Sequence, residues 1–157
     1  MIIVADTSPV MNLAVIGRLE ILQQLYGEIL IPDEVRKELS AMNIELPQWI
    51  NIRSATDRSL VESLLMELHP GEAEAIVLAK ELKAGFLLID ERRGRQIAAR
   101  FGLTYVGLLG VLVAAKRKKI IEEVKPLLND LLGKAGFWIS KELYDRILQE
   151  AGEVGQQ

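Results

Sequence analysis

The stretch Ile2-Ile3-Val4-Ala5-Asp6-Thr7-Ser8-Pro9 decides the fold. Its four apolar residues predict a short β-strand. The three residues able to cap a helix, followed by a proline, predict a helix start directly after that strand. The same change recurs at Phe86-Leu87-Leu88-Ile89-Asp90, where a fully apolar run, as expected of a buried parallel strand, ends at an acid. Both stretches therefore predict a strand that ends at an acidic side chain.

Short apolar runs alternate with helical patterns along the rest of the chain. Strands are expected at 2–5, 28–31, 86–89 and 103–106, and the alternation over 49–53 is compatible with a further strand. Helices are expected at about 9–16, 18–26, 33–40, 57–68, 71–83, 92–100, 108–118, 121–132 and 140–150, with Gly85 closing the helix over 71–83. Strands separated by helices indicate an α/β fold with a mainly parallel sheet. We expect a single domain over residues 1–157, with a C-terminal helical extension at about 133–152.

The amino-acid composition excludes several kinds of catalytic and metal-binding site. The chain has 157 residues, of which half are apolar, with no cysteine and a single histidine, His69. The lack of cysteine excludes disulfides, thiolate zinc sites and thiol nucleophiles, and one histidine excludes a mechanism that needs two imidazoles in one chain. The 19 basic and 22 acidic residues give a net charge of −3, whereas a passive nucleic-acid-binding module is usually basic.

The sequence predicts neither a membrane span nor a secretory signal. The longest uncharged stretch, 101–115, is shorter than the roughly 20 apolar residues that a membrane-spanning helix requires. The first residues lack a basic segment and reach an acid at Asp6, which does not fit a signal peptide. We therefore expect a cytoplasmic protein that does not interact with membranes.

Acidic residues follow two of the predicted strands. Asp6 ends the first strand, and Asp90 and Glu91 follow the strand at 86–89. Working groups in parallel sheets lie beyond the carboxyl ends of the strands, so these acids are candidates for a site. The structural alternative is that Asp6 and Asp90 only cap the helices that follow them.

Two further acids are expected to face inward from helices. On a helical wheel Glu38 flanks an apolar stripe, and Glu72 falls on the apolar side of its helix, while Glu74 and Glu81 lie on the opposite side. The alternatives are a solvated i,i+4 partner for Glu38 and a complement to the helix dipole for Glu72. Clustered carboxylates repel one another unless they are protonated or neutralised by cations, and oxygen ligands without His or Cys suit Mg²⁺ or Mn²⁺.

Five segments in this order carry a resemblance to a known family: residues 4–9, 31–38, 68–76, 87–95 and 107–112. In these segments the chain resembles the PIN domain, the metal-dependent ribonuclease fold of VapC-type toxins. It resembles more closely an uncharacterised PIN-like branch found in prokaryotes, and the tail over 136–153 is similar to that branch too. The resemblance implies a three-layer α/β/α fold with a short, mainly parallel central sheet.

The resemblance also implies roles for the acids. Asp6 would be the metal ligand of the first strand, with Ser8 supporting it by hydrogen bonds. Glu38 would be the acid of the early helix, and Glu72 the acid at a helix start and a second metal ligand.

The last ligand would come from Asp90 or Glu91, and we favour Asp90 because it is nearer to the strand end. Leu108 stands where the branch often has threonine, so one hydroxyl that could reach the site is missing.

By the same resemblance we expect a metal-dependent endoribonuclease. One or two Mg²⁺ or Mn²⁺ ions would activate a water and leave a 5′-phosphate and a 3′-hydroxyl. The substrate would be RNA, and the protein would be the toxin of a toxin–antitoxin pair, a homodimer with an antitoxin protein as its partner. The main alternative is a catalytically inactive PIN-like module that binds RNA or protein. A phosphatase with Asp6 as nucleophile is disfavoured, because Ser8 stands where such a site needs a second aspartate.

Basic and aromatic residues have two interpretations each. Arg92, Arg93 and Arg95 follow the second acidic strand end and either bind RNA phosphates or form a solvated helix face. The aromatic residues of the second half and Trp49 are expected to pack in the core or in an interface, and a docking surface for a partner is the alternative. They are Trp49, Phe137, Trp138 and Tyr144.

Overall fold

The sheet consists of five short strands. They are Ile3–Ala5 (β1), Ile29–Ile31 (β2), Ile50–Ile52 (β3), Phe86–Leu88 (β4) and Tyr105–Val106 (β5). In the computed structural model, which describes residues 1–153, all neighbouring strands are parallel and their order is β3-β2-β1-β4-β5. The prediction of a short, mainly parallel central sheet is therefore confirmed.

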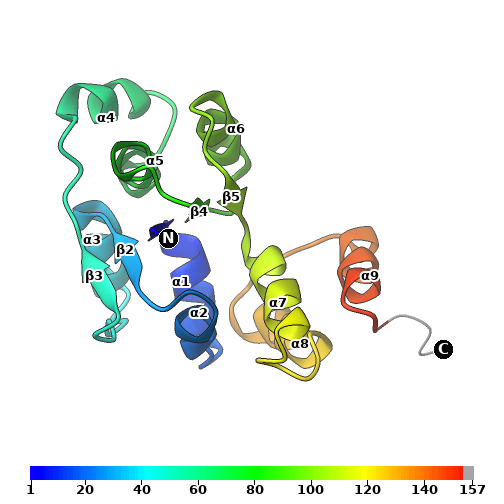
Figure 1. Cartoon of the computed structure of the whole chain (residues 1–157). Helices are drawn as coiled ribbons and strands as arrows, with labels where there is room; N and C mark the ends of the chain where they lie inside the picture. Colours follow the sequence, from blue (N-terminus) through cyan, green and yellow to red (C-terminus); the bar gives the residue numbers. More distant parts are fainter. Residues whose placement is uncertain (154–157) are drawn as a thin grey trace.

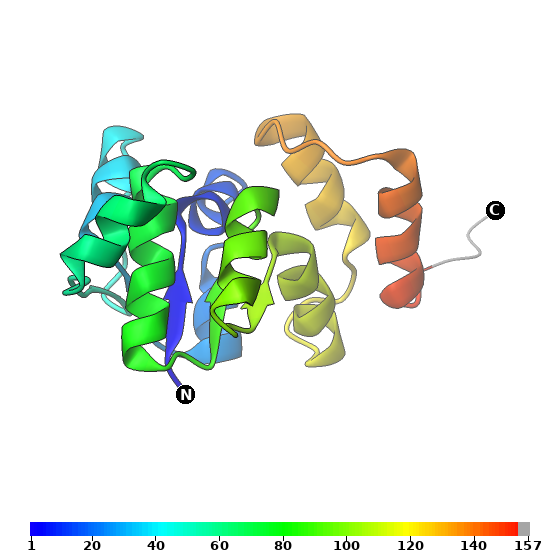
Figure 2. The same cartoon turned by 90° about the horizontal axis from the view of Figure 1, so that it is seen from above.

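Helices cover both faces of this sheet. They are Thr7–Val15 (α1), Glu20–Tyr26 (α2), Asp33–Ala41 (α3), Arg58–Leu64 (α4), Pro70–Leu82 (α5), Arg92–Arg100 (α6), Leu108–Arg117 (α7), Lys125–Lys134 (α8) and Lys141–Glu150 (α9). Figure 1 shows α4, α5 and α6 on one face, and α1, α2, α7 and α8 on the other. The helix α3 contributes Val35 and Leu39 to the same core as α1 and α2. Seen from above, α8 and α9 extend the second layer beyond α7 (Figure 2). This is the three-layer α/β/α arrangement that the resemblance implied.

The apolar strands contribute side chains to two separate hydrophobic cores, one on each face of the sheet. Side chains alternate between the faces of a strand, so Ile3 and Ala5 pack with α1, α2, α3, α7 and α8, while Val4 packs with α4, α5 and α6. In β4, Leu88 joins the first core and Leu87 the second. Burial of both faces explains why these strands are continuous apolar runs rather than alternating ones.

The strand order changes direction at β1. From β1 the chain builds β2 and β3 on one side, then crosses to β4 and β5 on the other. Ligands of open parallel sheets bind in the crevice at such a switch point, outside the carboxyl ends of the strands. The carboxyl ends of β1 and β4 are directly paired, with Ala5 opposite Leu88, so the acids that follow these strands are brought to the same place.

Some helix ends differ from those predicted from the sequence. The helix predicted at about 71–83 is α5, but the residue that closes it is Lys83 rather than Gly85, because Lys83 already adopts a left-handed conformation with φ of 51°. The helix expected at 121–132 begins only at Lys125, because the preceding residues turn back and the Glu153 carboxylate accepts hydrogen bonds from the Val124 and Lys125 amides. The stretch over 49–53 does contain a strand, β3, at the sheet edge next to β2.

The C-terminal part of the chain folds onto α7. The helices α8 and α9 contribute Leu127, Leu128, Leu131, Ile147 and Leu148 to the first core. The assignment of residues 1–157 to a single domain stays a prediction, and its last four residues lie outside the described part of the chain. Over residues 1–153 no helix has both the length and the apolar character required to cross a bilayer.

Candidate active site

Asp6 lies at the end of β1 and is almost fully buried, with 3% of its surface exposed. It occupies the position before α1, but its side chain makes no capping hydrogen bond. Burial raises the pKa of Asp6 to about 7, opposed by the Thr7 amide and assisted by the nearby carboxylates of Glu72, Glu38 and Asp90. The capping alternative for Asp6 therefore does not explain where this carboxylate is placed.

Glu38 reaches the same region from α3. Its Oε1 accepts a hydrogen bond of 2.5 Å from the Thr7 hydroxyl, and its Oε2 accepts one of 3.1 Å from the Gly71 amide at the start of α5. A Cβ atom at position 71 would lie 2.6 Å from either oxygen, so a larger residue there would displace this carboxylate from its present position. Glu38 is thus held toward Asp6 rather than being a solvated partner on its own helix.

Glu72 lies in the first turn of α5 and is 6% exposed. Its Oε1 accepts a hydrogen bond from the His69 amide at 3.1 Å, whereas Oε2 is buried and has no hydrogen-bond partner among residues 1–153. Burial raises the pKa of Glu72, the His69 amide lowers it, and Glu91 and Glu38 raise it further. An unpartnered buried carboxylate oxygen is unfavourable and calls for a ligand.

Asp90 shows the same feature at the end of β4. Its Oδ1 accepts hydrogen bonds from the Leu108 amide at 2.8 Å and from Arg95 at 3.4 Å, while Oδ2 is buried and lacks a partner within the described residues. Burial raises the pKa of Asp90, and the Leu108 amide and Arg95 oppose the shift. The Leu108 side chain is buried in the first core, so this residue contacts Asp90 through its backbone amide.

Glu91 differs from Asp90 in its surroundings. Its side chain is exposed and lies beside a hollow of about 450 Å³ that Asp6, Glu38 and Glu72 also line. Asp90 lines a neighbouring hollow of about 860 Å³, and Ser8, Met11 and Glu91 line both. The two hollows therefore adjoin, and the choice between Asp90 and Glu91 as a metal ligand stays open.

Two polar residues of α1 were missed by the sequence reasoning. Thr7 fixes Glu38, and the buried Asn12 donates a 3.2 Å hydrogen bond to the Ser8 hydroxyl. Ser8 was predicted to support Asp6, but in residues 1–153 its recorded side-chain partner is Asn12. The i,i+4 spacing of Ser8 and Asn12 is the one sequence signal that could have indicated this pair.

The acids converge without forming a complete metal site. No group of three or more acidic or histidine side chains in residues 1–153 already has the arrangement that holds a metal ion. The side chains that could contribute oxygen ligands are Asp6, Glu72, Asp90 and Glu91, and two of them carry the unpartnered oxygens. A bound cation would require these side chains to move closer together.

A family model described as PIN domain matches residues 2–153. The chain belongs to the PIN domain family. PIN domains are generally nucleases and generally use divalent metals, which agrees with a site composed of carboxylates.

Comparison with solved structures shows the same fold. The chain is similar to a PilT N-terminus domain protein from the hyperthermophilic archaeon Sulfolobus solfataricus P2, with a TM-score of 0.59 and 19% sequence identity. The similarity covers 73% of this chain and 93% of that chain. Comparison with curated proteins finds no match.

The three arginines that follow β4 differ in their roles in this PIN domain. Arg93 pairs with Glu67 and contacts Gln96, and it lines neither of the two hollows. Arg95 is held by the Ile89 carbonyl at 3.0 Å and by Asp90, with its guanidinium 5.6 Å from the centre of the Tyr105 ring. Arg92 is exposed, lines the larger hollow and forms no ion pair within residues 1–153.

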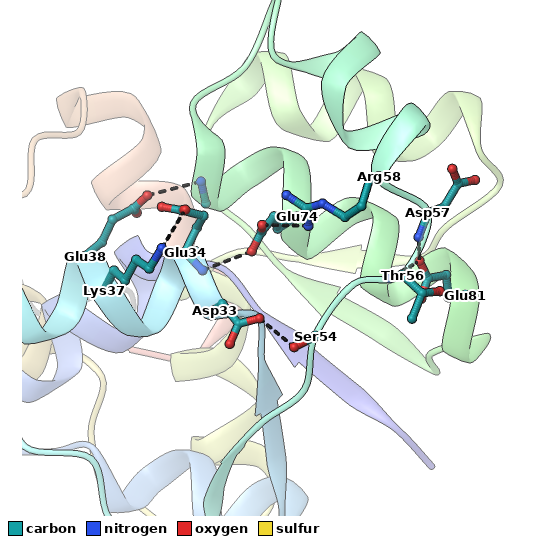
Figure 3. Close-up of polar contacts among 11 residues, drawn as sticks. Asp33, Glu34, Lys37, Glu38, Ser54, Thr56, Asp57, Arg58, Glu74 and Glu81 are labelled. Atoms are coloured by element: carbon teal, nitrogen blue, oxygen red, sulfur yellow. Dashed lines mark hydrogen bonds and ion pairs between the residues drawn. The ribbon is translucent and has the colours of Figure 1, made fainter.

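A second buried acid of the PIN domain lies outside the candidate site. Glu74, 3% exposed, accepts hydrogen bonds of 2.9 Å from the Glu34 amide and from Arg58, one on each oxygen (Figure 3). Further along α5, Glu81 accepts hydrogen bonds from the Thr56 and Asp57 amides. Both acids join α5 to neighbouring segments of the chain. Because both oxygens of Glu74 accept hydrogen bonds, neither is left without a partner as in Glu72 and Asp90.

Proposed function

We propose that this PIN domain is an endoribonuclease that depends on Mg²⁺ or Mn²⁺. The observation that carries the proposal is the pair of buried carboxylate oxygens without a partner, Glu72 Oε2 and Asp90 Oδ2, next to the buried Asp6. A chain that buries these groups loses stability unless a cation or proton compensates for them. Their position at the switch point of the sheet is where a ligand is expected.

The donor set fits a hard divalent cation. All candidate ligands are carboxylate oxygens, which Mg²⁺ and Mn²⁺ prefer. Within residues 1–153, Asp6, Glu38 and Glu72 form no ion pair with a lysine or arginine, so the chain itself supplies no compensating charge to them. Asp6, Glu72 and Asp90 would hold the cation, with Glu91 as the alternative to Asp90.

The residues around these ligands have distinct tasks. Thr7 and Gly71 each donate to one oxygen of Glu38 and so orient its carboxylate toward the hollow, where it can accept a proton from the attacking water. The Leu108 amide and Arg95 fix Oδ1 of Asp90, which leaves Oδ2 for a ligand. A bound divalent cation would lower the pKa of that water and neutralise charge on the scissile phosphate.

The finer parts of the proposal concern the substrate and the partners. RNA as the substrate, a role as the toxin of a toxin–antitoxin pair, an antitoxin protein as a partner and a homodimeric state are supported by the resemblance to VapC-type PIN domains. The same resemblance supports Mg²⁺ or Mn²⁺ as the ion. The alternative, a catalytically inactive PIN-like module, gives no reason for the two buried oxygens without a partner.

Cleavage of a labelled single-stranded RNA with Mn²⁺, with Mg²⁺ and with EDTA tests the proposal. We expect endonucleolytic products that carry a 5′-phosphate with either metal and none with EDTA, and a loss of at least about 100-fold in rate for Asp6→Asn, because even residues that only support metal ligands contribute 10- to 100-fold. Glu81→Gln, on the far part of α5, is the matched control and should keep the rate. The proposal fails if no RNA is cleaved with either metal, or if Asp6→Asn leaves the rate of cleavage unchanged.

A further inference from the structure

The larger hollow extends the candidate active site toward the C-terminal part of the chain. Its volume is about 860 Å³, within the range of about 300–1,000 Å³ that small-ligand sites occupy. Asp90 and Glu91 line it together with Tyr105, and residues of the segment after α8 and of α9 complete it. Because Ser8, Met11 and Glu91 also line the smaller hollow, a ligand in the larger one would lie next to the carboxylates.

Trp138 is the most exposed of the large apolar residues in this lining. It is 81% exposed, although its neighbours Phe137 and Ile139 pack against the core and the Phe137 amide is bonded to the Leu131 carbonyl. The segment is therefore anchored on both sides of Trp138, whose indole ring is left in water. The sequence predicted that Trp138 packs in the core or in an interface, and an indole that is 81% exposed is not packed in the core. An exposed tryptophan beside a hollow is typical of a recognition surface.

Positive charge is placed around the same hollow. Arg92 and Arg146 are exposed, line it and form no ion pair within the part of the chain that the structure describes. Arg95 lies over the Tyr105 ring. These arginines come from α6 and α9, so positive charge is present on both sides of the hollow, although the whole chain has a net charge of −3.

We infer that this hollow is a nucleobase-binding subsite for single-stranded RNA, in which Trp138 stacks on a base next to the scissile phosphate. The inference rests on the proposed function, since it places the strand against the same carboxylates. Aromatic side chains that stack on bases, combined with arginines that bind the phosphates, are how proteins hold single strands. In a duplex the bases are stacked on one another, so Trp138 would have no free base to stack on.

Binding without cleavage separates this inference from the proposed function. The chain has two tryptophans, so in a Trp49→Phe variant Trp138 is the only fluorescent indole. In EDTA, an RNA octamer of mixed sequence should quench this fluorescence, and the same octamer in a duplex should quench it far less. The affinity of a labelled octamer is measured by fluorescence anisotropy with proteins that retain Trp49. It should fall about 10-fold or more in Trp138→Ala and much less in Trp138→Phe.

Two further variants make the test specific. Arg146→Gln should weaken binding and reduce the salt dependence of the affinity by about one phosphate contact. Met66→Ala is the matched control, because Met66 is 89% exposed but belongs to the stretch between α4 and α5, outside both hollows. It should leave the affinity unchanged.

Three results of the binding experiments would each overturn the inference. They are equal affinity for the octamer in the wild type and Trp138→Ala, equal quenching by duplex and single strand, and quenching by an acidic peptide such as oligoglutamate but not by RNA. If Trp138→Ala cleaves RNA with an unchanged KM, the subsite is refuted while the nuclease stands. If the octamer binds at Trp138 but Mn²⁺ brings no cleavage, the nuclease is refuted while the subsite stands.

Discussion

Glu72 and Glu74 lie two residues apart on α5, and both are buried, yet their surroundings differ. Both oxygens of Glu74 are bonded, one to Arg58 and one to the Glu34 amide. Glu72 has one oxygen bonded to the His69 amide and the other without a partner in residues 1–153. Burial, together with the carboxylates of Glu91 and Glu38, raises the pKa of Glu72, whereas Glu74 forms an ion pair with Arg58.

The difference teaches how to separate a structural acid from a functional one in this fold. Burial alone does not distinguish them, since their exposed fractions are 6% and 3%. What distinguishes them is whether the chain itself provides the compensating charge and donors. Glu74 has a donor for each of its oxygens within the protein, whereas Oε2 of Glu72 has none among residues 1–153.

The largest expected effect concerns cleavage of RNA. Glu72→Gln should reduce the rate with Mn²⁺ by at least about 100-fold, because it removes the charge of a proposed metal ligand, and Glu74→Gln should stay within about threefold of the wild type. Single-turnover kinetics on one labelled RNA, at 20 °C so that both variants are folded, measures this. Equal losses in the two variants would mean that the two acids do not differ in function.

The next effect is a dependence of stability on pH in the absence of metal. The pKa of Asp6 is raised to about 7 from its ordinary value of 3.8, so the folded chain binds more protons than the unfolded chain between about pH 4 and pH 7. The free energy of unfolding should therefore fall as pH rises through this window, with Asp6 contributing up to about 1.4 kcal/mol per pH unit. Above about pH 7 its contribution should be constant.

Urea unfolding in EDTA at several pH values measures this contribution as the difference between the wild type and Asp6→Asn. The variant lacks the titrating group, so it should gain stability relative to the wild type from pH 4 to pH 7. Burial also raises the pKa values of Glu72 and Asp90, so the free energy of unfolding should still depend on pH in both proteins. Parallel curves for the two proteins would show that Asp6 titrates at its ordinary pKa.

The smallest effect concerns the stability of the two glutamine variants. In EDTA at pH 8, Glu74→Gln should lower the free energy of unfolding by about 1–3 kcal/mol, because the glutamine oxygen replaces only one of the two acceptors of Glu74 and the charge that pairs with Arg58 is lost. Glu72→Gln keeps an acceptor for the His69 amide and removes a repelled charge, so its stability should be unchanged or slightly higher. Chemical denaturation of both variants tests this, and the reverse order would contradict the assignment of Glu74 as structural.

The positions of the site acids could be predicted, because they follow from topology. Asp6 and Asp90 come directly after apolar strands, and parallel strands place their carboxyl ends together. Glu38 and Glu72 followed from the helical wheel combined with the resemblance. The main features of the fold were accessible for the same reason, since buried parallel strands and helices leave a distinct apolar pattern.

The contacts that hold these acids could not be predicted. Thr7 and Glu38 are 31 residues apart in the sequence, and Glu38 and Gly71 belong to different helices, α3 and α5. No local sequence pattern therefore indicates either contact. Glu74 was placed on the opposite side of α5 from Glu72, but a helical wheel assumes that one side of a helix is wet. The helix α5 is covered by α3, α4, α6 and the sheet, so both sides are buried.

Binding of Mn²⁺ tests the central claim most directly, because it requires neither a substrate nor catalysis. Isothermal titration at pH 7.5, with the melting temperature measured alongside, would compare the wild type, Glu72→Gln and Glu74→Gln. The account predicts that Mn²⁺ binds and stabilises the wild type and Glu74→Gln, while Glu72→Gln loses at least about 10-fold in affinity and most of the increase in melting temperature. Failure of the wild type to bind Mn²⁺ at millimolar concentration, or loss of binding in Glu74→Gln but not in Glu72→Gln, would contradict it.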